Sequence, residues 1–236
     1  MPRIFRTLLV TLALLSAAPL SSRAHTPSPS THIWTRAVPS VVMIEMADSK
    51  GEWMGKGSGF IIKSGEHKYI LTAGHCLRDP SLTYTIILWD GSKLPVLRTA
   101  LGPKDDDVAL AQVDDTKLNG CPELSLAEQN PYIGTELYVF GYPWTYKSVV
   151  ETEGIVSMFG KVGDRDFMFS TAVIWHGNSG GPIIDGDCKV VGIVDAMVQL
   201  PLGQSPFYLS VPVEPISKDL AGMVAEITKI APPTAK

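Results

Sequence analysis

Apolar residues along the chain fall into short runs separated by turn-forming residues, a pattern typical of an all-β protein. Hairpin-forming pairs stand between several of these runs, at Asp90-Gly91, Gly163-Asp164 and Asp185-Gly186. Many short strands at regular spacing favour a β-barrel or a β-sandwich. The runs that we expect to form strands cover residues 41–46, 58–62, 69–72, 83–89, 96–101, 108–113, 136–140, 149–159, 167–171, 182–184, 190–196 and 207–211.

Two changes in the pattern divide the chain. A polar segment with two prolines at residues 121–132 separates halves of similar size, so we predict one β domain at 34–120 and another at 133–212. At the C-terminal end apolar residues recur at helical spacing over 213–230, and two consecutive prolines follow. This spacing predicts a single C-terminal helix.

The N-terminal segment 1–24 has the features of a secretory signal peptide. Two arginines precede an almost purely apolar run, and small residues end at a cleavage site after Ala24, with Ala18 as the alternative. The apolar run is shorter than the ~20 residues that a membrane-spanning helix needs, which disfavours the alternative of an uncleaved membrane anchor. Residues 25–33 are rich in proline and serine and are expected to form a linker. We therefore expect a protein that is secreted or periplasmic, without a stable membrane anchor.

Composition and charge narrow the classes of function. The chain is 45% hydrophobic and 19% charged, as folded globular proteins are. Cleavage after Ala24 removes three arginines and changes the formal charge from −4 to −7, which argues against a nucleic-acid partner. Three cysteines leave at least one thiol unpaired, and no cysteine or histidine spacing indicates a metal site. We expect neither a metal nor a cofactor.

Residues 177–182 read Gly-Asn-Ser-Gly-Gly-Pro. A serine hydroxyl becomes a nucleophile when a base accepts its proton and donors stabilise the oxyanion that forms. Flanking glycines allow a sharp turn that points successive N–H groups to one spot, with Gly177 and Ser179 as the two donors. Taken alone, this segment is also compatible with a glycine-rich turn between strands.

A candidate base and a candidate acid stand elsewhere in the sequence. Of the five histidines, His75 directly follows an apolar strand, which would hold it rigidly as a general base requires. His176 is close to Ser179 in sequence but shares its turn. Asp107 adjoins the apolar run 108–113 and is the candidate for the acid that orients the imidazole, whereas the two aspartates before it are expected to be solvated.

These segments resemble a known family. Thr-Ala-Gly-His-Cys (72–76), Asp-Val-Ala-Leu (107–110) and Gly-Asn-Ser-Gly-Gly-Pro (177–182), in this order, resemble the signature blocks of trypsin/chymotrypsin-like serine proteases. Further blocks are similar to the protease domain of the HtrA/Deg branch and to bacterial trypsin-like peptidases. They are residues 38–42, 57–62, 139–143, 153–157 and 191–193.

The resemblance covers roughly residues 34–216. It implies the chymotrypsin-like fold, two six-stranded antiparallel β-barrels, here followed by the C-terminal helix. His75, Asp107 and Ser179 would form a catalytic triad in the cleft between the barrels, and the enzyme would cleave protein or peptide substrates through an acyl-enzyme without a cofactor. The sequence leaves the oligomeric state open.

The resemblance also implies a primary substrate pocket. Val173 and Ile174 would line its base, Ala196, Met197 and Phe207 would form its walls, and His176 would lie at its rim. None of these side chains is acidic, so we predict cleavage after apolar residues such as valine, alanine or leucine.

The sequence departs from the family pattern in several places. Trypsin-like zymogens are activated when a new N-terminal ammonium group pairs with an aspartate just before the serine, but Asn178 occupies that position here. We therefore expect activity without zymogen cleavage. Cys76 lacks the partner cysteine that animal trypsins carry and is expected to be a free, buried thiol, while Cys121 and Cys188 could form a disulfide.

Asp195 is a further departure, since similar proteases carry a serine or threonine at this position near the catalytic aspartate. Two arrangements are open. Its side chain either turns to the solvent, or lies near Asp107, where two carboxylates repel each other and raise one of the two pKa values.

Two alternative functions remain open. One is a non-catalytic binding protein on the same fold, although such proteins normally lose a triad residue and this sequence keeps all three. The other is an unrelated exported all-β protein in which the motifs are coincidental.

Overall fold

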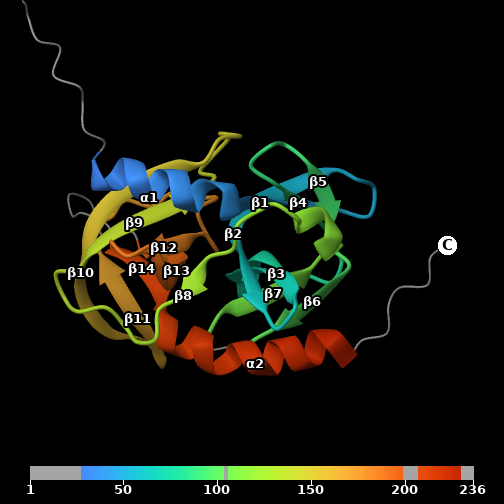
Figure 1. Cartoon of the computed structure of the whole chain (residues 1–236). Helices are drawn as coiled ribbons and strands as arrows, with labels where there is room; N and C mark the ends of the chain where they lie inside the picture. The colour runs from blue at the N-terminus through green and yellow to red at the C-terminus, as the bar shows by residue number, and fades with distance from the viewer. Residues whose placement is uncertain (1–27, 104–105, 199–206, 230–236) are drawn as a thin grey trace, which may run out of the picture.

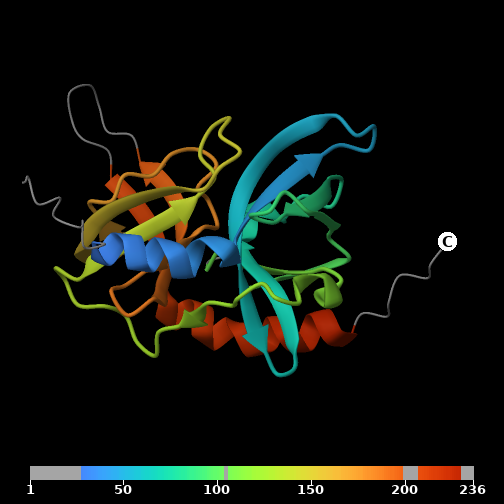
Figure 2. The ribbon, with the colours of Figure 1, turned by 45° about the horizontal axis from the view of Figure 1, so that its top comes forward.

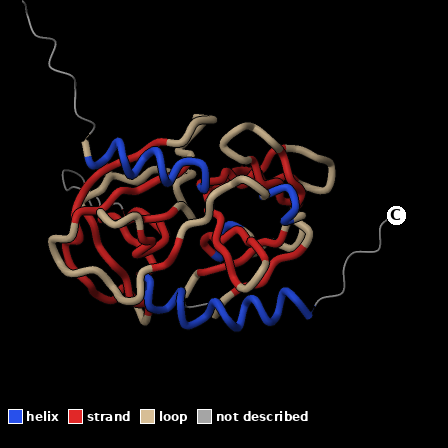
Figure 3. Tube along the Cα trace, in the orientation of Figure 1, coloured by secondary structure: helices blue, strands red, loops and turns tan. Residues whose placement is uncertain are grey.

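The computed structural model describes residues 28–103, 106–198 and 207–229. Its strands form two sheets that lie side by side, with a helix on each of two opposite outer faces (Figure 1). Figure 3 shows that strands make up most of both halves. The predicted all-β class with a C-terminal helix is confirmed, but only one of the two sheets closes into a six-stranded barrel, and the other is a half-barrel of seven strands. The predicted signal peptide lies outside the described residues.

The first sheet has the strand order β5-β4-β1-β2-β3-β7-β6. Its strands are β1 (Val41–Ala47), β2 (Trp53–Ser64), β3 (His67–Ala73), β4 (Thr83–Ile87), β5 (Lys93–Pro95), β6 (Arg98–Leu101) and β7 (Val108–Gln112). We expected one strand at 96–101, but the chain bends at Val96 and Leu97, and β5 and β6 pair with strands at opposite edges of the sheet. Because only two residues join these edges, the sheet must curl round on itself.

The second sheet closes into a barrel. It contains β8 (Ser125–Leu126), β9 (Glu136–Gly141), β10 (Val150–Val162), β11 (Arg165–Ser170), β12 (Pro182–Ile184), β13 (Lys189–Val198) and β14 (Phe207–Pro212). Antiparallel pairing runs through β12-β9-β10-β11-β14-β13 and returns from β13 to β12, so six strands form the closed barrel. The short β8 is added outside it, parallel to β13.

The N-terminal helix α1 (Pro29–Ala37) begins where we predicted a linker. Ser28 caps it, because its hydroxyl accepts a hydrogen bond from the N–H of Thr31, and Pro29 stands at the first position, where a missing N–H costs nothing. Ile33 and Ala37 are buried one helical turn apart, and α1 packs along the second sheet (Figure 2). Proline and serine therefore start a helix here, and the predicted linker is wrong from residue 29 onward.

The C-terminal helix α2 (Val213–Lys229) agrees with the predicted 213–230, whose last residue lies outside the described part. Its buried residues Val213, Ile216, Met223 and Ile227 recur at helical spacing, and it contacts strands of both sheets. Among the described residues no helix is long and apolar enough to cross a membrane.

Each half has its own apolar core, and a third cluster joins the two halves. Phe60 and Leu71 from the first sheet belong to that joint cluster together with Phe140 and Ile193 from the second. The halves are therefore packed against each other, and residues at their junction can hold a fixed geometry.

Candidate active site

His75 lies at the junction of the two halves, immediately after the buried strand β3. A short 3-10 helix, η2 (Gly74–Cys76), carries it. The N–H of Gly74 donates to the carbonyl oxygen of Asp107 at 2.7 Å, and a Cβ at Gly74 would lie 2.9 Å from a carboxylate oxygen of Asp107. Glycine at this position therefore allows the two segments to approach.

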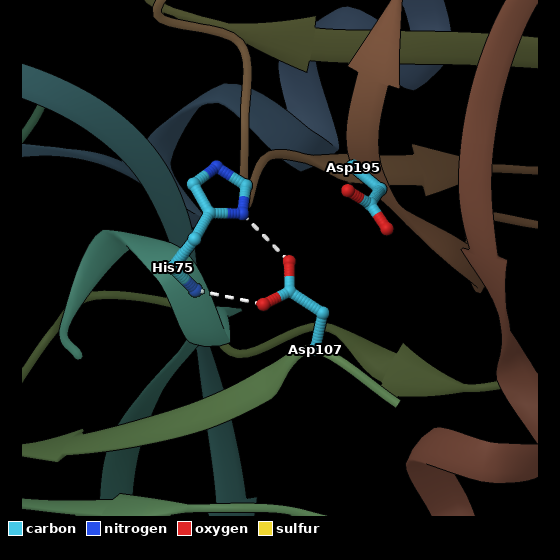
Figure 4. Close-up of side chains that lie close together, drawn as sticks. All are labelled: His75, Asp107 and Asp195. Carbon is cyan, nitrogen blue, oxygen red and sulfur yellow. Dashed lines mark hydrogen bonds and ion pairs between the residues drawn. The ribbon is translucent and has the colours of Figure 1, made fainter. Parts of the chain in front are cut away.

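Asp107 accepts two hydrogen bonds from His75 (Figure 4). The backbone N–H of His75 donates to Oδ1 at 2.9 Å, and the ring Nδ1 lies 2.6 Å from Oδ2. This pairing places the ring proton on Nδ1 when the imidazole is neutral, which leaves Nε2 as an acceptor. Arg78 adds a third contact, Nη2 to Oδ1 at 3.2 Å.

The strand register explains why Asp107 reaches His75. Strands β3 and β7 are antiparallel and pair Ala73 with Val108, so the residues that follow and precede them meet at one sheet end. Asp107 itself has a positive φ of 48°, which is uncommon for a non-glycine residue, and its side chain is buried. Such a backbone persists only where neighbouring contacts stabilise it.

Burial alone would raise the pKa of Asp107, but the hydrogen bond and positive charge of His75, together with the arginines Arg165 and Arg78, hold this pKa below its ordinary value. The pKa of His75 moves the other way. Burial would lower it, but the hydrogen bond to Asp107 and the neighbouring Cys76 raise it well above its ordinary value. The surroundings thus favour the imidazolium, the form that a general base takes after accepting a proton.

Ser179 stands on a tight turn pressed against the first sheet. Gly177 and Gly180 on either side of it have positive φ values of 98° and 84°. A Cβ at Gly180 would lie 2.0 Å from the hydroxyl oxygen of Thr72, so no larger residue fits. The carbonyl oxygen of Ser179 accepts a hydrogen bond from the N–H of Ser58 at 2.8 Å. Contacts with β2 and β3 therefore fix the turn.

The hydroxyl of Ser179 donates to the carbonyl oxygen of Asp195 at 3.3 Å. Ser179 is half-buried, so a reactant can reach it. The site thus brings Ser179, His75 and Asp107 to the junction of the halves, with the serine hydroxyl turned toward β13.

The peptide that carries the N–H of Gly177, one of the two predicted oxyanion donors, has a defined orientation. The carbonyl oxygen of His176 accepts from the N–H of Trp144 at 2.7 Å, and because the peptide is planar the N–H of Gly177 points the opposite way. Within the part of the chain that the structure describes, the N–H groups of Gly177 and Ser179 have no hydrogen-bond partner. The N–H of Asn178, between them, donates instead to the carbonyl oxygen of Trp175.

A cavity of about 170 Å³ lies beside Ser179. Of the predicted pocket residues, Ile174, His176, Ala196 and Met197 line it. Val173 does not: it is 37% exposed, and its carbonyl oxygen accepts from Thr152. The side chain of Phe207 lies outside the described residues. The prediction missed Trp175, Val194 and Asp195, which also line the cavity.

Asp195 is buried, with 6% of its surface exposed, so the solvent-facing arrangement is wrong. Its carboxylate pairs with the guanidinium of Arg165, from β11. Burial raises the pKa of Asp195 above its ordinary value, and the charge of Asp107 adds to this effect while Arg165 opposes it. No signal in the sequence pointed to Arg165, because the two residues belong to different hairpins.

Donor atoms of His75, Asp107 and Asp195 all lie within 4.8 Å of one another. This spacing alone would allow a metal ion. However, Arg78 already pairs with one carboxylate and Arg165 with the other, so positive charge is present at both. The arrangement is better described as a network of charges around His75.

The three cysteines are free thiols. Cys76 is buried, as predicted. The possible disulfide between Cys121 and Cys188 is not formed. Cys121 packs at the core of the first sheet, whereas Cys188 belongs to the cluster that joins the halves, so the two thiols lie in different parts of the fold.

Comparisons with known proteins agree with this geometry. A family model described as the trypsin-like peptidase domain matches residues 57–193. Among curated proteins, the chain is 31% identical over 149 residues to a "probable periplasmic serine endoprotease DegP-like" of Chlamydia pneumoniae, covering 61% of this chain and 29% of that protein. It is 28% identical over 191 residues to "serine endoprotease DegS" of Escherichia coli K12, covering 76% of this chain and 52% of that protein.

A solved structure shows the same fold. The crystal structure of the serine endoprotease from Yersinia pestis matches with a TM-score of 0.70 at 22% identity, covering 85% of this chain and 68% of that chain. The chain spans about a third to a half of the length of the curated relatives it matches.

Proposed function

Because the chain belongs to the trypsin-like peptidase domain family, we propose that it is a serine endopeptidase. One observation carries the proposal: Asp107 holds His75 by two hydrogen bonds beside the turn of Ser179, where two N–H groups are unpaired. This arrangement combines a nucleophile, an oriented base and an oxyanion site.

In the proposed reaction the hydroxyl of Ser179 rotates from Asp195 toward the free Nε2 of His75. As Oγ attacks the substrate carbonyl, His75 accepts the hydroxyl proton, and the N–H groups of Gly177 and Ser179 bind the oxygen that becomes negative. The imidazolium then donates this proton to the leaving amine, and the C–N bond breaks. Water, deprotonated by His75, hydrolyses the acyl-enzyme, and the proton returns to Oγ.

We infer a preference for apolar residues before the cleaved bond. Ile174, Val194, Ala196 and Met197 supply apolar lining, and a cavity of about 170 Å³ suits valine, alanine or leucine better than an aromatic ring. The one carboxylate in the lining, Asp195, is paired with Arg165. A peptide library in which arginine or glutamate is strongly preferred at this position would contradict the assignment.

We further propose that activity does not depend on zymogen cleavage. Asn178 is buried, carries no charge, and donates its N–H to the carbonyl oxygen of Trp175, so this turn holds its conformation without an ammonium partner. Export rests on the N-terminal sequence and on the periplasmic names of relatives such as that of Chlamydia pneumoniae. Equal peptidase activity of chains with and without residues 1–24 would support independence from N-terminal processing.

The decisive test is cleavage of an unfolded protein substrate. Replacing Ser179 by alanine is expected to abolish it, whereas Ser157→Ala, an exposed serine on β10, serves as the matched control and is expected to leave it unchanged. Cleavage that survives in Ser179→Ala, or a wild type that binds peptides without cleaving them, would favour a non-catalytic binding protein.

A further inference from the structure

The ion pair between Arg165 and Asp195 lies beside the proposed catalytic residues, and the reaction described above does not use it. Arg165 begins β11 and its guanidinium also lies over the ring of Phe167, 4.6 Å from the centroid. The Asp195 carboxylate points toward the same space as His75 and Asp107 (Figure 4). A buried carboxylate at this distance must affect the charge balance of the imidazole.

The backbone of Asp195 is also unusual. The pairing of β13 with β14 matches Val194 with Ser210 and Ala196 with Leu209, so Asp195 is the extra residue of a β-bulge. A bulge leaves its residue out of the ladder and re-aims the side chain. Because the backbone of Asp195 is not paired in the ladder, the ion pair of its carboxylate with Arg165 holds the residue in place. Its carbonyl oxygen accepts the hydrogen bond from the hydroxyl of Ser179.

The two residues of the ion pair have opposite effects on the charge of the site. Asp195 adds a negative charge next to Asp107, which alone would make ionisation of both carboxylates unfavourable. Arg165 cancels this charge, and its field also reaches Asp107. Leaving a buried charge without its partner costs far more than removing both partners together.

We propose that Arg165 and Asp195 act together as a pair of positioning residues, which holds the bulge carbonyl against Ser179 and keeps the charge around His75 balanced. The inference rests on the proposed function for its consequence in catalysis. Its electrostatic part concerns His75 directly and can be measured without turnover.

Several charged or titratable groups belong to the network around His75, either beside its ring or paired with the two carboxylates near it. They come from four elements: Asp107 before β7, Asp195 on β13, Arg165 on β11, and Arg78 and the Cys76 thiol in and after η2. Of these, Asp195 and Arg165 contact each other directly, so both can be replaced in one double variant. The other contacts of His75 stay in place in that double variant.

The test measures the pKa of His75 by NMR titration of its imidazole in four chains. In Arg165→Met the methionine keeps an apolar contact with Phe167 but leaves Asp195 unpaired, so the pKa of His75 is expected to rise by about one unit. In Asp195→Asn the cation remains, and the pKa is expected to fall by about one unit. The double variant is expected to return close to the wild-type pKa.

The pH dependence of kcat/KM is measured on the same chains. Its acid limb, which reports the base, is expected to move upward in Arg165→Met and downward in Asp195→Asn. We expect kcat/KM at neutral pH to fall about tenfold in Arg165→Met and to recover in the double variant. Lys161→Met is the matched control, because Lys161 and Asp166 form an exposed ion pair, 3.5 Å apart, on the same hairpin.

His75 pKa values that agree within about 0.3 unit in all four chains would overturn the inference. So would a double variant that is as impaired as Arg165→Met. If Arg165→Met does not fold, Arg165→Lys, which keeps the charge, must retain the wild-type pKa, and Asp195→Asn must still lower it. A wild type that does not cleave the substrate would contradict the proposed function. The NMR result would still decide whether the ion pair affects the pKa of His75.

Discussion

Asp107 and His75 are joined at two points, one through the backbone N–H of His75 and one through its ring Nδ1, so the carboxylate fixes both the position and the tautomer of the imidazole. A single hydrogen bond would leave the ring free to rotate about it. The two bonds depend on Gly74, where a side chain would collide with Asp107.

Replacing Asp107 by asparagine should keep the shape of the site but remove the charge that stabilises the imidazolium. The amide can also donate to Nδ1, which would place the ring proton on Nε2. A protonated Nε2 cannot accept the hydroxyl proton of Ser179. We expect kcat to fall by about 10⁴-fold, the general magnitude for this change in Ser-His-Asp enzymes. The control is Asp115→Asn, which breaks a similar but exposed contact of 2.8 Å with His67 and should leave kcat unchanged. A loss below about tenfold in Asp107→Asn would contradict the assigned role.

Glycine at position 180 should be indispensable. Gly180 has a positive φ, and a Cβ at this position would lie only 2.0 Å from the hydroxyl oxygen of Thr72, so Gly180→Ala must displace the turn that carries Ser179. We expect loss of cleavage and a free energy of unfolding lower by about 2 kcal/mol or more. Gly222→Ala, at an open helical position on α2, should instead raise the free energy of unfolding by about 0.5–1 kcal/mol. Urea unfolding of both variants checks this, and similar effects of the two changes would count against it.

A new disulfide should form between β2 and η2 when position 57 carries a cysteine. A Cβ at position 57 would lie 3.5 Å from the Cβ of Cys76, within the range of disulfides. We expect Gly57→Cys to bond with Cys76 under oxidising conditions and to raise the free energy of unfolding by about 3 kcal/mol. Thiol titration of the unfolded, unreduced chain should find two free thiols. Four would show that position 57 and Cys76 are not neighbours.

The helix α2 carries a carboxyl group that should make stability depend on pH. Burial is the main cause that raises the pKa of Asp219 to about 6, and the hydrogen bond and the charge of Asp106 add to it. An acid with a raised folded pKa favours the folded state while protonated, and this stabilisation is lost as the pH rises through about 6. Asp219→Asn should therefore raise stability at pH 8 and change it little near pH 4. Urea unfolding at both pH values, with the exposed Glu226→Gln on the same helix as control, tests this; a pH-independent difference would contradict it.

Much of the site was predictable because its residues lie in local patterns. The apolar run before His75 and the glycines around Ser179 each identify a strand end or a turn, and the resemblance of their order to that of trypsin-like proteases implies that these segments meet. The proximity of His75 and Asp107 was implied by the family resemblance, and the antiparallel register of β3 and β7 accounts for it.

The remaining features depend on contacts between distant segments. The Arg165–Asp195 pair joins residues of two hairpins, and nothing near either residue indicates the other. The helix α1 was missed because proline and serine are common both in linkers and at helix starts, and the burial of Ile33 and Ala37 decides between them. The sequence could not exclude a disulfide between Cys121 and Cys188, because a count of cysteines gives no information on the distance between their Cα atoms.

The central claim is that Ser179 is a nucleophile activated by His75. Reaction with a fluorophosphonate probe, followed by mass mapping of the modified peptide, tests it most directly, because the probe bonds only to an activated hydroxyl. The account predicts one adduct per chain, located on Ser179 and absent from both Ser179→Ala and His75→Ala. An unmodified wild type, or an adduct on another residue, would contradict it.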